Sequence, residues 1–87
     1  MPETVLVSIE CGGRQADFEL PARVPLKHVE RALLEAVRST LMIFPEPDTQ
    51  PELRFRGIAI SKEWTLEQCG VFDGSILQLI LRGKGRG

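Results

Sequence analysis

The first twenty residues alternate between apolar and polar positions in two runs. Residues 4–11 and 15–20 each place every second side chain on one face of an extended strand, and those side chains are apolar. The inward-facing members are Val5, Val7, Ile9, Ala16, Phe18 and Leu20. Gly12-Gly13 separates the runs, and two glycines supply the positive φ angles of a tight hairpin turn. We therefore predict a β-hairpin here.

The hydrophobic period changes from two to about 3.6 residues after Pro25. The apolar positions that recur at this helical spacing are Leu26, Val29, Leu33 and Val37. Charged residues occupy the opposite side, and proline is favoured in the first turn of a helix. The pattern predicts an amphipathic helix over residues 25–39.

The second half of the chain returns to short extended segments. Residues 41–51 contain three prolines after an apolar start, which predicts an ordered loop whose first residues cover the core. Residues 53–57 and 58–60 read as short strands on either side of a turn. Residues 65–68 can form one capped helical turn, and residues 75–81 alternate as a final strand.

This order of elements predicts an α+β fold of the β-grasp kind. Such a fold is a mixed sheet of four to five strands with one helix packed across one face. Its first and last strands lie side by side and in parallel at the centre of the sheet. We assign residues 1–82 to this domain and residues 83–87 to a flexible, basic, glycine-rich C-terminal tail.

Composition narrows the class of protein. A chain of 87 residues with 43% hydrophobic and 26% charged residues is expected to form one globular domain. No apolar run approaches the roughly 20 residues that cross a bilayer, so no membrane insertion is expected. The first residues carry no basic region typical of a secretory signal, and we expect a cytoplasmic protein. The net charge of −1 argues against nucleic acid as a partner.

Few residues offer chemistry of their own. Cys11 and Cys69 are most simply two small hydrophobes in a reducing compartment, and a disulfide between them is the alternative. His28 is the single histidine, and no Cys-x-x-Cys occurs, so no metal site is expected. No nucleophile with a base and no pair of acids stands at a readable spacing. We expect neither a catalyst nor a bound cofactor.

The chain closes on a basic, glycine-rich sequence, Arg82-Gly83-Lys84-Gly85-Arg86-Gly87. Three of the eleven lysines and arginines stand there, which leaves eight against twelve acidic residues in the body. This asymmetry favours a tail that meets an acidic surface. One interpretation is a frayed terminus. The other is a carboxylate that threads through a narrow channel of a partner enzyme.

The second half of the chain also resembles ubiquitin without a gap. The matching motifs are Leu53-Arg54-Phe55-Arg56-Gly57, Thr65-Leu66, Gly70-Val71 and Leu77-Gln78-Leu79-Ile80-Leu81-Arg82. The stretch from Thr65-Leu66 through Cys69-Gly70-Val71 to Asp73-Gly74 is still more similar to bacterial ubiquitin-like proteins of the YukD type. The resemblance implies the ubiquitin-like β-grasp fold.

The resemblance to ubiquitin further implies a bacterial protein modifier conjugated through Gly87. Arg82 and Lys84 match the basic tail positions of ubiquitin, Gly85 matches the first of its paired glycines, and Arg86 replaces the second. These four residues would be recognised by an activating enzyme that uses ATP to adenylate the terminal glycine. A carrier enzyme, a processing protease and target proteins complete the implied partners.

A partner surface is implied as well. Arg54 stands at the central isoleucine position of ubiquitin's apolar recognition patch, and Ile80 keeps the matching valine position apolar. Proteins that recognise ubiquitin through this patch should bind poorly, because an arginine would lie at the centre of their contact.

Two other functions fit the same fold. The segment Cys69-Gly70-Val71 favours a YukD-like accessory protein of type VII secretion, which acts through non-covalent contacts and needs no free tail. A sulfur carrier, whose terminal glycine becomes a thiocarboxylate, is the third reading. Arg86 counts against it, because such carriers usually end in Gly-Gly.

Overall fold

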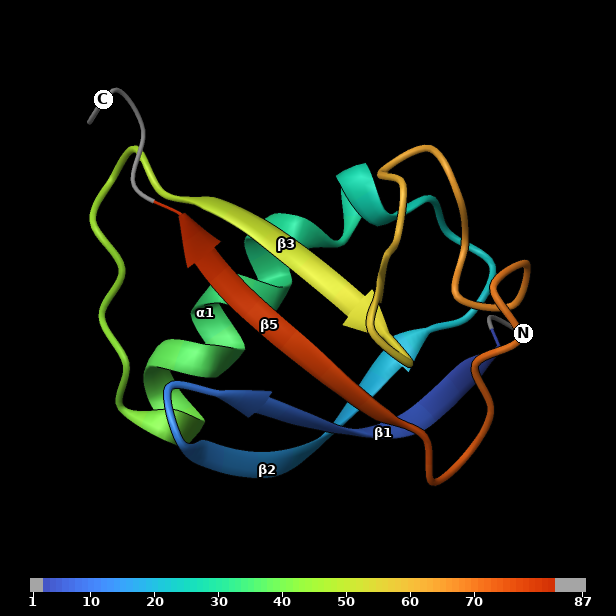
Figure 1. Cartoon of the computed structure of the whole chain (residues 1–87), viewed down its shortest axis with the longest axis horizontal. Helices are drawn as coiled ribbons and strands as arrows, with labels where there is room; N and C mark the ends of the chain where they lie inside the picture. The colour runs from blue at the N-terminus through green and yellow to red at the C-terminus, as the bar shows by residue number, and fades with distance from the viewer. Residues whose placement is uncertain (1–2, 83–87) are drawn as a thin grey trace.

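The computed structural model describes residues 3–82 as one mixed sheet with one α-helix beneath it (Figure 1). The elements are β1 (Thr4–Cys11), β2 (Arg14–Pro21), a 3-10 turn (Leu26–His28), α1 (Glu30–Leu41), β3 (Gln50–Phe55), β4 (Ile58–Ala59) and β5 (Ile76–Arg82). The strand order is β2-β1-β5-β3-β4. The two central strands, β1 and β5, are parallel, and the other neighbours are antiparallel. The α+β, ubiquitin-like β-grasp prediction is confirmed, with five strands.

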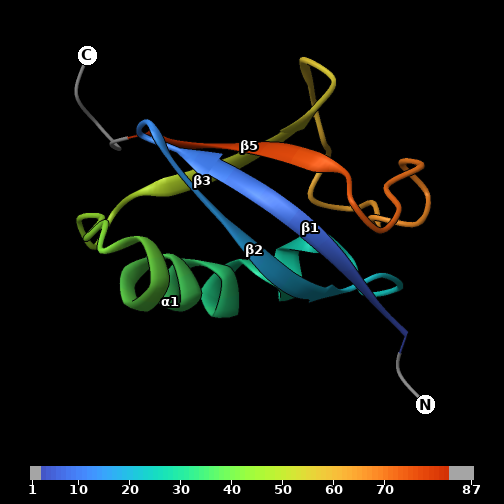
Figure 2. The ribbon, with the colours of Figure 1, turned by 90° about the horizontal axis from the view of Figure 1, so that it is seen from below.

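One helix covers one face of the sheet. Figure 2 shows α1 below the strands and the opposite face of the sheet uncovered. The predicted tail, residues 83–87, lies outside the described residues, so its boundary with the domain at residue 82 stays a prediction. Within residues 3–82, no helix is both long and apolar enough to cross a bilayer.

The N-terminal hairpin forms as its alternation predicts. Every residue of β1 pairs with a residue of β2. The turn between them lies at Gly12 and Gly13, whose φ angles are 58° and 79°. Side chains other than glycine rarely adopt this left-handed region at two successive positions, so the glycine pair fixes the register of the hairpin.

The helix begins later than its apolar spacing predicts. Leu26–His28 is a 3-10 turn, and the α-helix starts at Glu30. The reason lies in the chain that runs alongside: the Leu26 N–H donates to the Trp64 carbonyl, and the Lys27 N–H donates to the Lys62 carbonyl, each at 3.0 Å. These bonds satisfy the first free donors of the segment without an α-helical turn.

The helix also ends two residues later than predicted. Leu41 is buried and continues the stripe formed by Leu33 and Val37. The guanidinium of Arg14 on β2 donates from Nη1 to the Leu41 carbonyl at 2.6 Å, which satisfies a free acceptor at the helix C-terminus. Met42 then takes a left-handed conformation with a φ of 57° and ends the helix.

The proline-rich loop is shorter than predicted, because Pro51 lies inside β3. The Leu53 carbonyl accepts the Ile60 N–H, so Leu53 directs its backbone groups toward β4. Pro51, two residues away, directs its nitrogen to the same side, beyond the two-residue β4. Because no strand of residues 3–82 pairs with that part of the edge, the missing N–H of proline leaves no gap in the sheet.

The apolar start of this loop covers the core only in part. Ile43 is half-buried against the core. Met42 and Phe44 are 59% and 62% exposed, so their predicted role in covering the core is wrong.

The segment before β5 forms a capping box without a helix. The Thr65 N–H donates to Gln68 Oε1 at 2.9 Å, and the Gln68 N–H donates to Thr65 Oγ1 at 3.1 Å. The next turn closes through a bond from the Cys69 N–H to the Leu66 carbonyl. The segment therefore remains a tight turn, which buries Leu66 completely.

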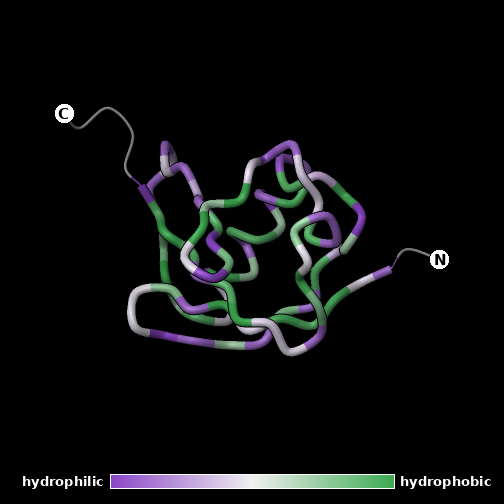
Figure 3. The backbone as a smooth tube through the Cα atoms, turned by 45° about the vertical axis from the view of Figure 1, so that its right-hand side comes forward, coloured by the Kyte–Doolittle hydropathy of each residue, from purple (hydrophilic) through white to green (hydrophobic). Residues whose placement is uncertain are grey.

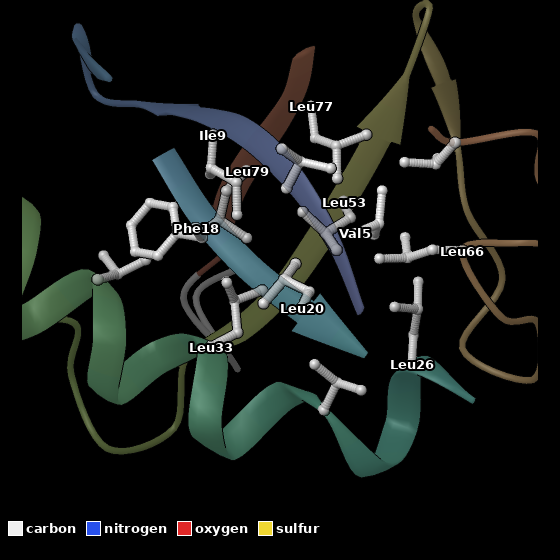
Figure 4. Close-up of a cluster of buried hydrophobic side chains, with 14 of the residues drawn as sticks. Val5, Ile9, Phe18, Leu20, Leu26, Leu33, Leu53, Leu66, Leu77 and Leu79 are labelled. Carbon is white, nitrogen blue, oxygen red and sulfur yellow. The ribbon is translucent and has the colours of Figure 1, made fainter. Parts of the chain in front are cut away.

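The core lies between α1 and the inner face of the sheet. Hydrophobic and hydrophilic residues are interleaved along the backbone (Figure 3), so each strand contributes alternate side chains to the core. The labelled members in Figure 4 are Val5, Ile9, Phe18, Leu20, Leu26, Leu33, Leu53, Leu66, Leu77 and Leu79. All the inward residues predicted for the hairpin lie in or against this cluster.

Candidate docking surfaces

The outer face of the sheet carries the side chains that alternate, along each strand, with those of the core. Register fixes their neighbours: Glu52 on β3 lies opposite Ile80 on β5, and Arg54 lies opposite Gln78. Since α1 covers the other face, this outer face is the broad surface of the fold that no element of residues 3–82 covers (Figure 2). It is therefore the first place to look for a binding surface.

An ion network crosses from β3 to β5 on this face. Arg54 Nε lies 2.6 Å from Glu52 Oε2, and Arg82 Nε lies 2.9 Å from Glu52 Oε1. One carboxylate thus holds two guanidinium groups, each through a different oxygen. The hydrogen bond from Arg82, and then that from Arg54, holds the pKa of Glu52 below its ordinary value.

The structure brings together three residues that the sequence singled out. Arg54, Ile80 and Arg82 lie on the same outer face around Glu52, which pairs with both arginines and lies opposite Ile80 in the register. Glu52 was missed, although a residue two positions before Arg54 on a strand must share its face. Lys84, Gly85, Arg86 and Gly87 lie outside the described residues, and their predicted roles stay predictions.

Apolar side chains form a second feature of this face. Leu6 on β1 and Ile76 on β5 point outward and are 49% and 57% exposed. Phe72, in the loop before β5, is 58% exposed, and this loop is tied to β1 by a 2.8 Å bond from the Gly74 N–H to the Leu6 carbonyl. The available sequence signal was a large apolar residue at an outward position of each strand.

Carboxylates surround the apolar residues on the β1–β2 side. Asp17 accepts a hydrogen bond from Ser8 Oγ at 2.7 Å, and Glu19 accepts one from Thr4 Oγ1 at 3.0 Å. Asp73 accepts the backbone N–H of Leu6 at 2.9 Å. These neutral donors orient the carboxylates but leave their charge in place.

A groove lies between α1 and the free part of the β3 edge. Its cavity volume is about 310 Å³, and its apolar floor includes Leu26, Leu33 and Pro51. Lys62 Nζ stands at its rim, 3.0 Å from Glu30 Oε2 and 3.3 Å from Gln50 Oε1. The positive and negative charges at this rim are paired with one another, so the groove carries no strong preference of charge.

The cysteines are free thiols. Cys11 is buried and Cys69 is half-buried, and burial raises the pKa of both thiols. A raised pKa lowers the share of nucleophilic thiolate. Within residues 3–82, no group of three or more His, Cys, Asp or Glu side chains is placed to hold a metal ion.

Comparison with known proteins relates the chain to a family named after a secretion system. A family model described as WXG100 protein secretion system (Wss), protein YukD, matches residues 4–79. No curated protein sequence matches the chain significantly.

Solved structures with the same fold include both secretion proteins and a ubiquitin. The ubiquitin-like domain of the Mycobacterium tuberculosis type VII secretion system protein ECCD1 is 25% identical with a TM-score of 0.75, over 90% of this chain and 98% of that one. A chain of the ESX-3 core complex is 29% identical with a TM-score of 0.63, over 98% of this chain and 17% of that one. Caldiarchaeum subterraneum ubiquitin is 25% identical with a TM-score of 0.66, over 97% and 100%.

The family model spans nearly the whole described fold, from the start of β1 into β5, and includes both strands that carry the exposed apolar residues. The chain belongs to the YukD family of the WXG100 protein secretion system.

Proposed function

We propose that the protein is a non-covalent docking module of a type VII secretion apparatus, which acts at the cytoplasmic side of the membrane. The observation that carries the proposal is the YukD family match over residues 4–79. The likeness to a part of the ESX-3 core complex supports it, because that chain places the same fold within a larger secretion assembly.

The outer sheet face supplies the contact surface for this role. A small domain gains nothing in stability from exposing Leu6 and Ile76 side by side with charged groups, and exposed apolar patches are typical of protein–protein contacts. The strands beneath are held by the core, so the surface is rigid and needs little ordering on binding.

The test is affinity capture from detergent-solubilised membranes of the native host, with a tag placed at the N-terminus. We expect the chain to recover membrane components of the secretion apparatus, identified by mass spectrometry. A variant that ends at Arg82 should recover the same components, because the contact uses the folded domain. Ile76→Asp should recover far less. Recovery of none of these components by the intact chain would contradict the proposal.

A ubiquitin-like modifier is the second candidate function. The observation that favours it is the terminal sequence, in which Arg82, Lys84 and Gly85 match tail positions of ubiquitin and the chain ends in Gly87, although Arg86 replaces the second paired glycine. An activating enzyme would use ATP to adenylate Gly87 and pass it to a carrier enzyme, and a protease would process the chain.

Reconstitution separates this second candidate from the first. The purified chain is incubated with ATP and an activating enzyme encoded beside it, and intact-mass spectrometry looks for an adenylate, a thioester or a thiocarboxylate. A thiocarboxylate would instead identify a sulfur carrier. If removal of Gly87 changes no product, the modifier reading is wrong.

A further inference from the structure

We infer that the outer face binds a basic, partly apolar segment of a partner protein, seated over β1, β2 and the first half of β5. This inference rests on the proposed docking function and names the chemistry of its partner. Its two supports are the division of charge across the face and the position of the exposed apolar side chains.

Charge divides along the line between β1 and β5. The outward positions of β1 and β2 carry Glu10, Asp17 and Glu19, and no lysine or arginine. The outward positions of β3 and β5 carry Arg54 and Arg82 around the single carboxylate of Glu52. One half of the face is therefore acidic, and the other half carries one more positive than negative charge.

The carboxylates of the acidic half have no cationic side chain of residues 3–82 beside them. Within residues 3–82, no lysine or arginine nitrogen lies within 4.0 Å of the carboxylates of Glu10, Asp17 or Glu19. Glu52 is different, since two arginines already neutralise it. A partner's lysines gain most where carboxylates lack a cation and least beside Arg54 and Arg82, so charge complementarity places the basic side chains over β1 and β2.

The apolar seat, formed by Leu6 on β1 and Ile76 on β5, straddles the edge of this acidic half. Register pairs Ser8 with Ile76 across the central strands, and Leu6 stands two residues before Ser8 on the same outward row. Leu6 also lies opposite Glu19, and Ser8 lies opposite Asp17. A segment whose apolar side chains cover Leu6 and Ile76 thus brings neighbouring basic side chains over carboxylates, which fixes its position on the face.

The experiment titrates two synthetic peptides into the isotope-labelled full chain and follows backbone amide shifts. One peptide carries leucines at helical spacing with lysines elsewhere, and the other carries glutamates in place of the lysines. We expect the lysine peptide to bind at least about tenfold more tightly than the glutamate peptide. Its affinity should fall as salt is added. Its shifts should centre on β1, β2 and the start of β5.

Matched variants assign the effect to the acidic half. The double variant Asp17→Lys, Glu19→Lys should bind the lysine peptide at least about tenfold more weakly. Glu46→Lys with Asp48→Lys changes the net charge equally, in the exposed loop of residues 42–49, and should leave affinity within about twofold. Thermal unfolding of each variant confirms that the fold is retained.

Three results of the peptide titration would overturn the inference. They are equal affinity for both peptides, equal loss in the control variant, and shifts centred on the groove between α1 and β3. Concentration-dependent dimerisation of the chain alone, detected by sedimentation velocity, would assign the face to a second copy and also overturn it. If membrane capture succeeds while the Asp17→Lys, Glu19→Lys variant is captured equally, the docking function stands and this partner chemistry is wrong.

Discussion

The two faces of the sheet are built from the same strands but differ in burial and in role. On β5, Leu77 is completely buried, whereas Ile76 just before it is 57% exposed. The inner face packs against α1 and fixes the fold, whereas the outer face holds charged and exposed apolar groups that contribute much less to stability. Because neighbouring residues alternate between faces, stability and recognition are separable one residue at a time.

The sharpest test of this separation compares Leu77→Ala with Gln78→Ala. Leu77 fills the core, so its truncation should cost about 2–5 kcal/mol of unfolding free energy. Gln78 faces solvent, and its truncation should change stability by less than about 0.5 kcal/mol. Urea unfolding at neutral pH measures both. Equal losses would mean that the outer face stabilises the fold as much as the inner face does.

The next pair tests the polar contact between the hairpin and the helix. Arg14→Ala removes the guanidinium that bonds the Leu41 carbonyl at 2.6 Å and should cost about 1–2 kcal/mol. Gln15→Ala, next along β2, should be close to neutral by the same chemical unfolding assay. A neutral Arg14→Ala would show that water caps the helix equally well.

The ion network on the outer face predicts a pH dependence. Arg82 and Arg54 hold the pKa of Glu52 below its ordinary value of 4.5. A lowered pKa in the folded chain adds stability above the unfolded value and loses it as the pH falls through the folded value. The melting temperature of the wild type should therefore exceed that of Glu52→Gln at pH 7, and this difference should shrink below pH 4.5. A difference that grows on acidification would contradict the network.

Ile76→Ser is expected to change stability as little as Gln78→Ala does. The side chain is exposed, so unfolding free energy should change by less than about 0.5 kcal/mol. Capture of secretion components should nevertheless fall strongly, because the apolar seat is lost. Stability is followed by thermal melting and binding by the membrane capture assay. Unchanged capture would remove Ile76 from the docking surface.

The sequence predicted the elements better than their ends. Alternation and helical spacing depend on nearest neighbours, which is why the hairpin, the helix and the final strand are in place. The start of α1 depends on Lys62 and Trp64, and its end depends on Arg14, all distant in the chain. Pro51 was excluded from a strand because its edge position is a property of the assembled sheet.

The candidate site was predicted only in part, for a related reason. Arg54 and Ile80 were found through resemblance, but their link through Glu52 to Arg82 requires the register between β3 and β5. The exposed Leu6 and Ile76 looked like ordinary members of apolar strands. Their exposure follows from the position of α1, which covers only the other face of the sheet.

The parallel pairing of β1 with β5 also governs how the molecule can fold. It joins Ser8 to Ile76, so the central contact closes a loop that contains most of the chain. Closing this loop costs conformational entropy before the contacts across it contribute any energy. We therefore predict slow, all-or-none folding rather than a stable half-formed domain. A nascent chain on the ribosome therefore keeps its inner face exposed until β5 has been synthesised, and chaperones have that interval in which to act.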